Sequence, residues 1–300
     1  MEFRELQYFL AVVKEGTISG AAGALHVAQP SLSRQMRELE EKIGTTLFVR
    51  GNRKITLTED GLILQRRANE IVQLMQKTEQ ELGSSKEDMS GDIYIGAAEA
   101  NAVHYLTRAA ASLLGTYPNI RFHIASGDTT DTKYQLEQGL IDFALLFYPY
   151  DLEKYNYIRL PVSDRMVALM RKDHPLSEKH SVSLRKDLKN EPLILSRLAQ
   201  GMSVQGIDTS SLHIIGTYNL AYNASIMVED GLGIALCFDS IVNINDRNNL
   251  CIVPVSDMGT GINPAIIWKK YQAMTPIAKA YIDELHCFTE QTQDYEKDTL

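Results

Sequence analysis

The sequence predicts an α/β chain of more than one domain, in which a small helical domain precedes a larger region of strands and helices. Apolar residues recur at helical spacing through the first 44 residues and again through residues 59–83. Beyond residue 92, short apolar runs of strand length alternate with helical segments, which indicates sheets covered by helices. A chain of 300 residues is also too long for one ordinary core, so we expect two or three domains.

The composition is that of a soluble globular protein, with 44% hydrophobic and 23% charged residues. Apolar runs such as "YFLAVV" are far shorter than the roughly 20 residues that span a membrane, and "MEFRELQ" is no signal peptide. The cysteines are odd in number and widely spaced, which argues against a disulfide framework or a zinc site. We therefore expect a cytoplasmic protein without a metal or cofactor. The cysteines are Cys237, Cys251 and Cys287.

Charge is distributed unevenly along the chain, whose formal net charge is −8. Residues 1–57 carry eight Lys or Arg against six Asp or Glu, a net charge of +2, which leaves −10 for the remainder. The first domain is therefore the only positive region, and it is where contact with an acidic partner such as nucleic acid is expected.

Three helices are predicted in this first domain. The first covers about 3–15 and stops at Gly16, and Ser19 is a plausible N-cap for a short second helix, "GAAGAL". Pro30 opens the third helix at its first position, where the missing N–H costs nothing, and Gly44 ends it. The apolar stripe of the third helix is Leu32, Met36, Leu39 and Ile43.

Two short strands around a basic turn are predicted over 45–57, followed by a long helix over 59–83 that Thr58 caps. Glu59 and Asp60 in its first turn match the helix dipole. The apolar residues of this helix are spaced as in a heptad repeat, which suggests a dimerising arm. One heptad position holds Ala68, Met75 and Leu82, and the other holds Leu64, Ile71 and Thr78.

The third helix combines an apolar stripe with polar and basic residues at its start, which suggests that it recognises DNA. Its buried stripe leaves small, polar and basic residues exposed at its start, where Gln can pair with adenine and Arg with guanine. The basic turn that follows resembles a wing able to contact phosphates or a minor groove. An amphipathic hairpin with solvated charges is the alternative, which the wing disfavours. The candidate DNA-binding residues are Gln29, Pro30, Ser31, Ser33, Arg34, Arg37, Arg50, Arg53 and Lys54.

The acidic end of the same helix calls for a separate interpretation. Glu38, Glu40 and Glu41 are expected where the helix leaves the duplex, and their charge would oppose deeper or misregistered docking. Glu38 is also expected to pair with Lys42 one turn on.

Residues 83–92, "GSSKEDMSGD", are predicted to form a hinge. Apolar runs such as "DIYIG", "DFALLF" and "GIALC" then alternate with helical segments, which implies parallel sheets covered by helices on both faces. The expected helices in this region cover about 103–114, 130–139, 219–230 and 276–291.

The run "TISGAAGALHVAQPSLSRQMRELEEKIGTTLFVR", followed by "ITLTEDG", resembles the N-terminal signature of LysR-type transcriptional regulators. The resemblance is strong over 1–65 and continues by pattern afterwards. It implies a winged helix-turn-helix (1–58), a linker helix and hinge (59–88), and a two-lobed effector domain like periplasmic solute-binding proteins. Lobe I would comprise 89–162 plus 268–300, and lobe II 163–267.

The same resemblance implies partners and a ligand site. Such regulators act as homodimers or homotetramers on inverted repeats in double-stranded DNA, communicate with RNA polymerase, and bind a small effector between the lobes. Residues at the ends of strands and at the starts of helices would form that effector site. Carried over by position, the effector-binding residues are Glu99, Ala100, Asn101, Asp128, Thr129, Phe147, Tyr148, Ser196, Arg197, Asn219 and Tyr222.

The chain departs from common family members at this site. Many relatives place a small hydroxyl residue where Glu99 and Asp128 stand, and a carboxylate at a helix start repels an incoming anion. We therefore expect a neutral, polar or cationic effector, unless Arg197 or His104 reverses the local field. In addition, "LAQGMSVQGIDTSSL" is short for a crossover between parallel strands, so one wall of the site is expected to be thin or open.

Three other functions are weighed against a regulator. An enzyme is disfavoured because catalytic motifs are absent and the histidines are scattered. A solute-binding protein would suit residues 91–292, but not the winged N-terminus. A thiol-based redox sensor of the same family remains an alternative, although Cys237 and Cys251 lie in apolar strand runs where cysteine usually behaves as a small hydrophobe.

Overall fold

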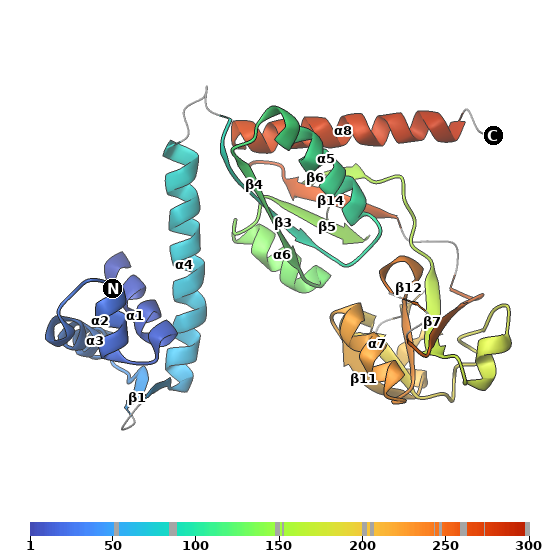
Figure 1. The fold of residues 1–300 in the computed structure, drawn as a ribbon, viewed down its shortest axis with the longest axis horizontal. Coiled ribbons are helices and arrows are strands. Elements are labelled where there is room, and N and C mark those ends of the chain that lie inside the picture. Colours follow the sequence, from blue (N-terminus) through green and yellow to red (C-terminus); the bar gives the residue numbers. More distant parts are fainter. Residues whose placement is uncertain are drawn as a thin grey trace. The chain divides into compact units, whose positions relative to one another are not determined.

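The chain folds into two compact units, residues 1–83 and 84–300, which are described separately below (Figure 1). The structure is a computed structural model. It describes residues 1–50, 54–83, 89–147, 151, 153–199, 203–204, 207–242, 244–245, 248–258, 263–272 and 274–297.

The first unit is three helices, a strand pair and a long helix. Its core lies where α1, α2 and α3 meet, with Phe9, Leu32, Met36 and Leu39 fully buried. The strands pair antiparallel, as expected for a wing. In chain order the elements are α1 (Phe3–Glu15), α2 (Ile18–Ala24), α3 (Gln29–Ile43), β1 (Phe48–Arg50), β2 (Ile55–Leu57) and α4 (Glu59–Gly83).

Local capping sets most of these boundaries. Gly16 and Gly44 end α1 and α3 in the left-handed region, with φ of 65° and 83°, where glycine has no steric penalty. The cap of α2 is Thr17, whose Oγ1 accepts from the Gly20 amide, so the expected cap at Ser19 was wrong. Likewise α3 begins at Gln29, one residue before Pro30.

The start of α4 agrees with the expected cap, because Thr58 Oγ1 accepts from the Gly61 amide at 3.0 Å. Gly61 is required for packing, since a Cβ there would lie 2.2 Å from the Leu47 carbonyl oxygen. Only part of the expected apolar stripe of α4 is buried in the first unit. Ala68 and Leu64 pack into the core of the first unit, whereas Ile71, Met75 and Leu82 are exposed.

The second unit contains two five-stranded sheets, which define its lobes. The lobe I sheet has the order β4-β3-β5-β14-β6. Helices α5 and α8 pack on one face of it, and α6 packs on the other (Figure 1). The elements are β3 (Gly91–Ala97), α5 (Val103–Thr116), β4 (Ile120–Ser126), α6 (Thr129–Glu137), β5 (Phe143–Phe147), β6 (Tyr155–Arg159), β14 (Pro264–Lys269) and α8 (Pro276–Lys297).

The lobe II sheet has the order β11-β8-β12-β7-β13, with α7 on one face. The other face is covered by turns and by 3-10 helices such as η1 (Pro175–Glu178). Its elements are β7 (Met166–Arg171), β8 (Leu193–Ser196), β11 (Ile214–Tyr218), α7 (Ala221–Glu229), β12 (Ile234–Phe238), η4 (Asp239–Ile241) and β13 (Leu250–Pro254).

Two expectations about this unit need correction. Neither sheet is purely parallel, because β14 pairs antiparallel with β5 and β6, and β7 pairs antiparallel with β12 and β13. The expected return to lobe I at residue 268 cuts through β14. Since Pro264 already pairs with Phe147 of β5, the chain has re-entered lobe I by Pro264.

The short connection after β8 contains no α-helix among its described residues. It consists of η2 (Arg197–Ala199), a two-stranded pair formed by β9 (Ser203–Val204) and β10 (Ile207–Asp208), and η3 (Thr209–Ser211). The chain nevertheless returns to place β11 parallel to β8. A small β pair and 3-10 turns thus stand where a crossover helix would be usual.

Candidate functional site

The third helix of the first unit presents a polar face. Leu32, Met36 and Leu39 are fully buried and fix the orientation of α3. Gln29, Pro30, Arg34 and Arg37 are exposed on the other side, and Ser31 and Ser33 are half-buried. The first turn holds no acidic residue, so the amides at the helix start are compatible with a phosphate.

The basic residues of α3 are held along the helix. The Arg34 Nε lies 3.6 Å from Glu38 Oε1, and the Arg37 Nε donates to the Ser33 carbonyl at 3.3 Å. Lys42 lies 3.4 Å from Glu5 of α1, so the expected Glu38–Lys42 pair was wrong. Glu38 instead pairs with Arg34, one turn earlier on the helix.

The acidic end of α3 has mixed roles. Glu40 Oε1 accepts from the amides of Leu47 and Phe48, at 2.8 and 3.1 Å, and so fastens the first wing strand to the helix. This carboxylate is therefore structural, in contrast to the docking role expected for it. Glu38 and Glu41 are exposed.

The wing places Lys54 in an exposed position directly before β2. The strands are in register from Phe48 opposite Leu57 to Arg50 opposite Ile55. Arg53 and the side chain of Arg50 lie outside the described residues.

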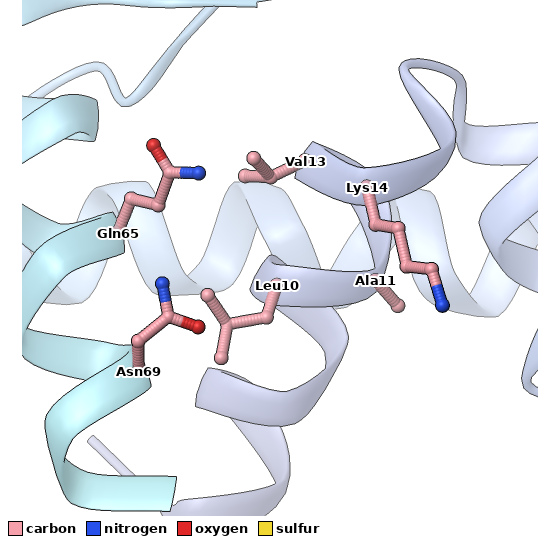
Figure 2. A pocket seen from close by; sticks show the side chains of 6 residues that line it. All are labelled: Leu10, Ala11, Val13, Lys14, Gln65 and Asn69. Atoms are coloured by element: carbon pink, nitrogen blue, oxygen red, sulfur yellow. The ribbon is translucent and has the colours of Figure 1, made fainter. Parts of the chain in front are cut away.

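A groove of about 490 Å³ lies between α1 and α4 of the first unit. Figure 2 shows the amide side chains of Gln65 and Asn69 facing Leu10 and Val13, with Lys14 at the margin. Within the described part of the chain, no group of His, Cys, Asp or Glu could hold a metal ion there or elsewhere. The groove thus has no evident chemistry of its own.

In the second unit, carboxylates gather at the carboxyl ends of β3 and β4. These strands run parallel with Ala97 opposite Ser126, so the residues that follow, Glu99 and Asp128, emerge at the same edge. Asp128 caps α6, because its Oδ1 accepts from the amides of Thr130 and Asp131 at 2.9 and 3.0 Å. This cap uses one carboxylate oxygen and leaves the other for a second partner.

That second partner is Arg197 of lobe II. Its Nε donates to Asp128 Oδ2 at 2.8 Å, and its Nη2 donates both to that atom and to Asp131 Oδ2, the latter at 2.8 Å. Burial by itself would raise the pKa of Asp128, but the Asp131 amide, the Arg197 guanidinium and the Thr130 amide outweigh it and lower that pKa. Asp128 is therefore an ionised link between the lobes.

A second carboxylate also joins the lobes. Glu99 Oε2 accepts from the Ala221 amide, the first residue of α7, at 2.5 Å. The carboxylate thus provides a hydrogen-bond acceptor for an amide at the start of a helix. That helix is α7 of lobe II, and not α5, which follows Glu99 in the chain. Nearby, the rings of Phe147 in lobe I and Phe238 in lobe II lie 4.9 Å apart between centroids.

Asp164, on the segment that leads from β6 to β7, is a third carboxylate of this region. Its side chain is buried, with 1% of the residue exposed. Its Oδ1 accepts from the Asn101 amide at 3.3 Å and from the Ser240 hydroxyl. Its Oδ2 has no hydrogen-bond partner among the described residues. We call Glu99, Asp128, Asp131, Asp164 and Arg197 the interlobe seam.

The structure places the remaining sequence-predicted residues as follows. Ala100 is buried, Thr129 is the first residue of α6, and Ser196 lies opposite Tyr218 in the β8–β11 pair. Asn219 is exposed, and Tyr222 is 70% exposed. Tyr148 lies outside the described residues.

Sequence reasoning missed Asp131, Asp164, Phe238 and Ser240. Asp131 had a local signal, because it lies three residues after Asp128 at the start of a helix. Asp164 and Ser240 had none, since their proximity to Asn101 depends on how the chain crosses between lobes.

Cys237 and Cys251 are poorly placed for a disulfide with each other. Cys237 is opposite Val167 and Cys251 opposite Met170 of the intervening strand β7, so roughly 14 Å separates their Cα atoms at ordinary strand spacing. Disulfides require less than about 7 Å. Burial raises the pKa of Cys237 to about 12, which disfavours its reactive thiolate form. Cys287 on α8 is exposed.

A winged helix-turn-helix with an exposed polar and basic face, joined to a two-lobed α/β domain, is typical of DNA-binding regulators controlled by small ligands. Residues 3–62 match the bacterial regulatory helix-turn-helix protein, lysR family, and residues 86–288 match the LysR substrate binding domain. The chain therefore belongs to the LysR family of transcriptional regulators, and the expected fold and family are confirmed.

Relatives and solved structures agree with this assignment. The HTH-type transcriptional regulator BsdA of Bacillus subtilis (strain 168) is 25% identical over 94% of this chain and 99% of its own length. The hydrogen peroxide-inducible genes activator of Pectobacterium carotovorum subsp. carotovorum is 28% identical over 85% and 81%. The structure of CbnR, a LysR family transcriptional regulator, matches the fold with a TM-score of 0.70 at 19% identity, over 96% and 99%.

Family membership also fixes what kind of protein this is. The chain is a DNA-binding transcriptional regulator with an effector-binding domain, and its family consists of regulators rather than enzymes. Among the described residues, no helix is both long and apolar enough to cross a membrane.

Proposed function

We propose that the exposed face of α3 reads base edges in a major groove while the β1–β2 wing anchors the protein on phosphates. The observation that carries this proposal is the burial of Leu32, Met36 and Leu39, which commits the opposite face of α3 to solvent. The residues of that face that contact bases or adjacent phosphates are Gln29, Ser31, Ser33 and Arg34. Pro30 rigidifies the helix start, and Arg37 contacts the DNA backbone. Arg50, Arg53 and Lys54 form the wing contact.

The second half of α4 supports a proposal for assembly. Ile71, Leu74 and Met75 are exposed on it, and Leu82 is 83% exposed, at spacings that form one apolar face. A second copy of the chain covers this face, so that two α3 helices read an inverted repeat with half-sites about one helical turn apart. Two such dimers form a tetramer, and contact with RNA polymerase follows at the promoter.

The interlobe seam supports a proposal for control. A small effector binds between the lobes and changes the contacts that join them, and those contacts bias the DNA-binding form. The seam holds four carboxylates and one guanidinium. A neutral, polar or cationic effector suits this charge better than an anion.

Selection of DNA fragments by the purified protein tests the DNA-binding proposal. Genomic fragments retained by the full-length chain should share an inverted repeat, and a duplex carrying that repeat should shift at lower protein concentration than a charge-matched random duplex. Retention of fragments without a shared sequence, with equal affinity for both duplexes, would contradict it.

A further inference from the structure

The two partners of the Arg197–Asp128 contact differ in how firmly they are held. Asp128 is buried, and its Oδ1 is fixed by two amides of α6. Arg197 lies on the short η2 turn, and 51% of its side chain is exposed. Asp128 is thus fixed within lobe I, whereas Arg197 is a long side chain that is half exposed to solvent. If the contact opens, the buried carboxylate is the group that needs a new partner.

The seam already fills the positions that would attract an anion. The start of α7 holds the Glu99 carboxylate, and the Arg197 guanidinium holds Asp128 and Asp131. An anionic effector would have to displace carboxylates that are tethered to the chain and therefore present at high effective concentration. It would then also face the repulsion of the displaced groups.

The buried carboxylate of Asp164 is a separate observation about the charge of the seam. Its carboxylate is directed at the Asn101 amide, two residues after Glu99, and its Oδ2 lacks a donor among the described residues. A buried carboxylate oxygen without a donor is costly. The seam therefore has four carboxylates but only one guanidinium, so its acceptors and negative charge are in excess.

We propose that the effector is a small organic cation, with an ammonium or guanidinium group that replaces Arg197 on Asp128 and Asp131. This inference rests on the proposed function, because it concerns the effector that binds between the lobes. Arg197 is then a built-in competitor, and its release removes an ionic link between the lobes as the effector binds.

Calorimetry on the full-length protein at constant ionic strength tests the proposal. The probes are agmatine and 1,4-diaminobutane as cations, and succinate and benzoate as anions. At least one cation should bind and neither anion should. Asp128→Asn retains the helix cap and should weaken cation binding about tenfold or more. Arg197→Gln removes the competitor and should strengthen cation binding. A general loss of structure would not make one of these variants bind the cation more weakly and the other bind it more tightly.

The Arg171–Asp173 ion pair at the end of β7 provides matched controls. Its N–O distance is 2.7 Å, and Arg171→Gln and Asp173→Asn change the net charge as the seam variants do. These two variants should leave cation binding unchanged. Failure of both cations to bind wild type and Arg197→Gln, tighter binding of an anion, or weaker cation binding to Arg197→Gln would each overturn the proposal. Sequence-selective DNA binding, measured on the same samples, reports separately on the proposed function.

Discussion

The Arg197 guanidinium of lobe II lies on the Asp128 carboxylate of lobe I, with Nε 2.8 Å from Oδ2. The two residues are 69 positions apart in the sequence; Asp128 follows β4 of the lobe I sheet, and Arg197 follows β8 of the lobe II sheet. Because Asp128 also caps α6, the contact connects a helix start in one lobe to the strand end of β8 in the other. The lobes are thus joined by ionic and hydrogen-bonded contacts that a ligand or a change of salt can alter.

Arg197→Gln should lower the free energy of unfolding of the effector domain only slightly, since the exposed guanidinium is partly screened by solvent. The loss should shrink at high salt, because salt screens the contact that the variant lacks. Urea unfolding of wild type and variant at two salt concentrations measures both effects. A loss that is unchanged by salt would show that the pair does not act electrostatically.

Asp92 on β3 makes stability in lobe I depend on acid pH. Its carboxylate accepts from Arg121 Nε at 2.7 Å and lies 2.8 Å from His123 Nε2. The hydrogen bond from Arg121 lowers the pKa of Asp92 from 3.8 to about 2, against the opposing effect of burial. The ionised form therefore stabilises the fold above pH 3.8, and this contribution is lost as the pH falls toward about 2.

Asp92→Asn should consequently destabilise the protein near neutral pH by about 1–2 kcal/mol. This loss is smaller than the pKa shift alone would imply, because solvent screens the exposed Arg121 and His123 side chains. The difference from wild type should narrow as the pH falls from about 4 toward about 2. Chemical unfolding across this range measures it, with Asp283→Asn on an exposed part of α8 as the control. A difference that stays constant with pH would refute the assignment.

Glu38 is expected to influence how Arg34 selects DNA. Their ion pair lies along α3 with Nε 3.6 Å from Oε1, so Glu38→Gln frees the guanidinium and also removes a negative charge. The variant should reduce the preference for the selected duplex over a random one by about twofold, comparable to the ~0.5 kcal/mol of an exposed pair one turn apart.

Glu41→Gln is the matched control for this effect, because it removes the same charge further along the same exposed helix. Both variants should bind random DNA more tightly, whereas only Glu38→Gln should change the preference between duplexes. Equal preference ratios in fluorescence anisotropy titrations of the two variants would leave Glu38 with no role in positioning Arg34.

Treatment with peroxide should leave DNA binding unchanged. Cys237 is buried with a pKa of about 12, and its position in the sheet keeps it far from Cys251. A gel shift before and after oxidation, with thiol alkylation followed by mass spectrometry, tests this expectation. Peroxide-dependent binding that Cys237→Ser or Cys251→Ser abolishes would instead support the thiol-sensing alternative.

Local signals in the sequence predicted the first unit well, because its boundaries depend on neighbouring residues. Thr58 caps α4 as expected, and the stripe of Leu32, Met36 and Leu39 is buried as expected. Where two caps compete locally, the prediction failed, since Thr17 rather than Ser19 reaches the Gly20 amide.

Contacts between distant parts of the chain could be predicted only in part. Glu99, Asp128 and Arg197 were each named by position from the family resemblance, but their contacts depend on how the two sheets approach, which no local pattern encodes. The placement of β14 in lobe I and the contact of Asp164 with Asn101 have the same non-local origin. Sequence patterns therefore indicate which side chains emerge at strand ends, whereas the structure shows which of them meet.

The most direct test of the central claim, that α3 reads sequence while the wing anchors, is a comparison of Arg34→Ala with Lys54→Ala. Binding of each variant to the selected duplex and to single-base variants of it is measured over a range of salt. Arg34→Ala should cost about 1–3 kcal/mol and relax the preference at one base position. Lys54→Ala should weaken all duplexes similarly and flatten the salt dependence. If both variants lose affinity equally on every duplex, with the same change in salt dependence, the division between reading and anchoring is wrong.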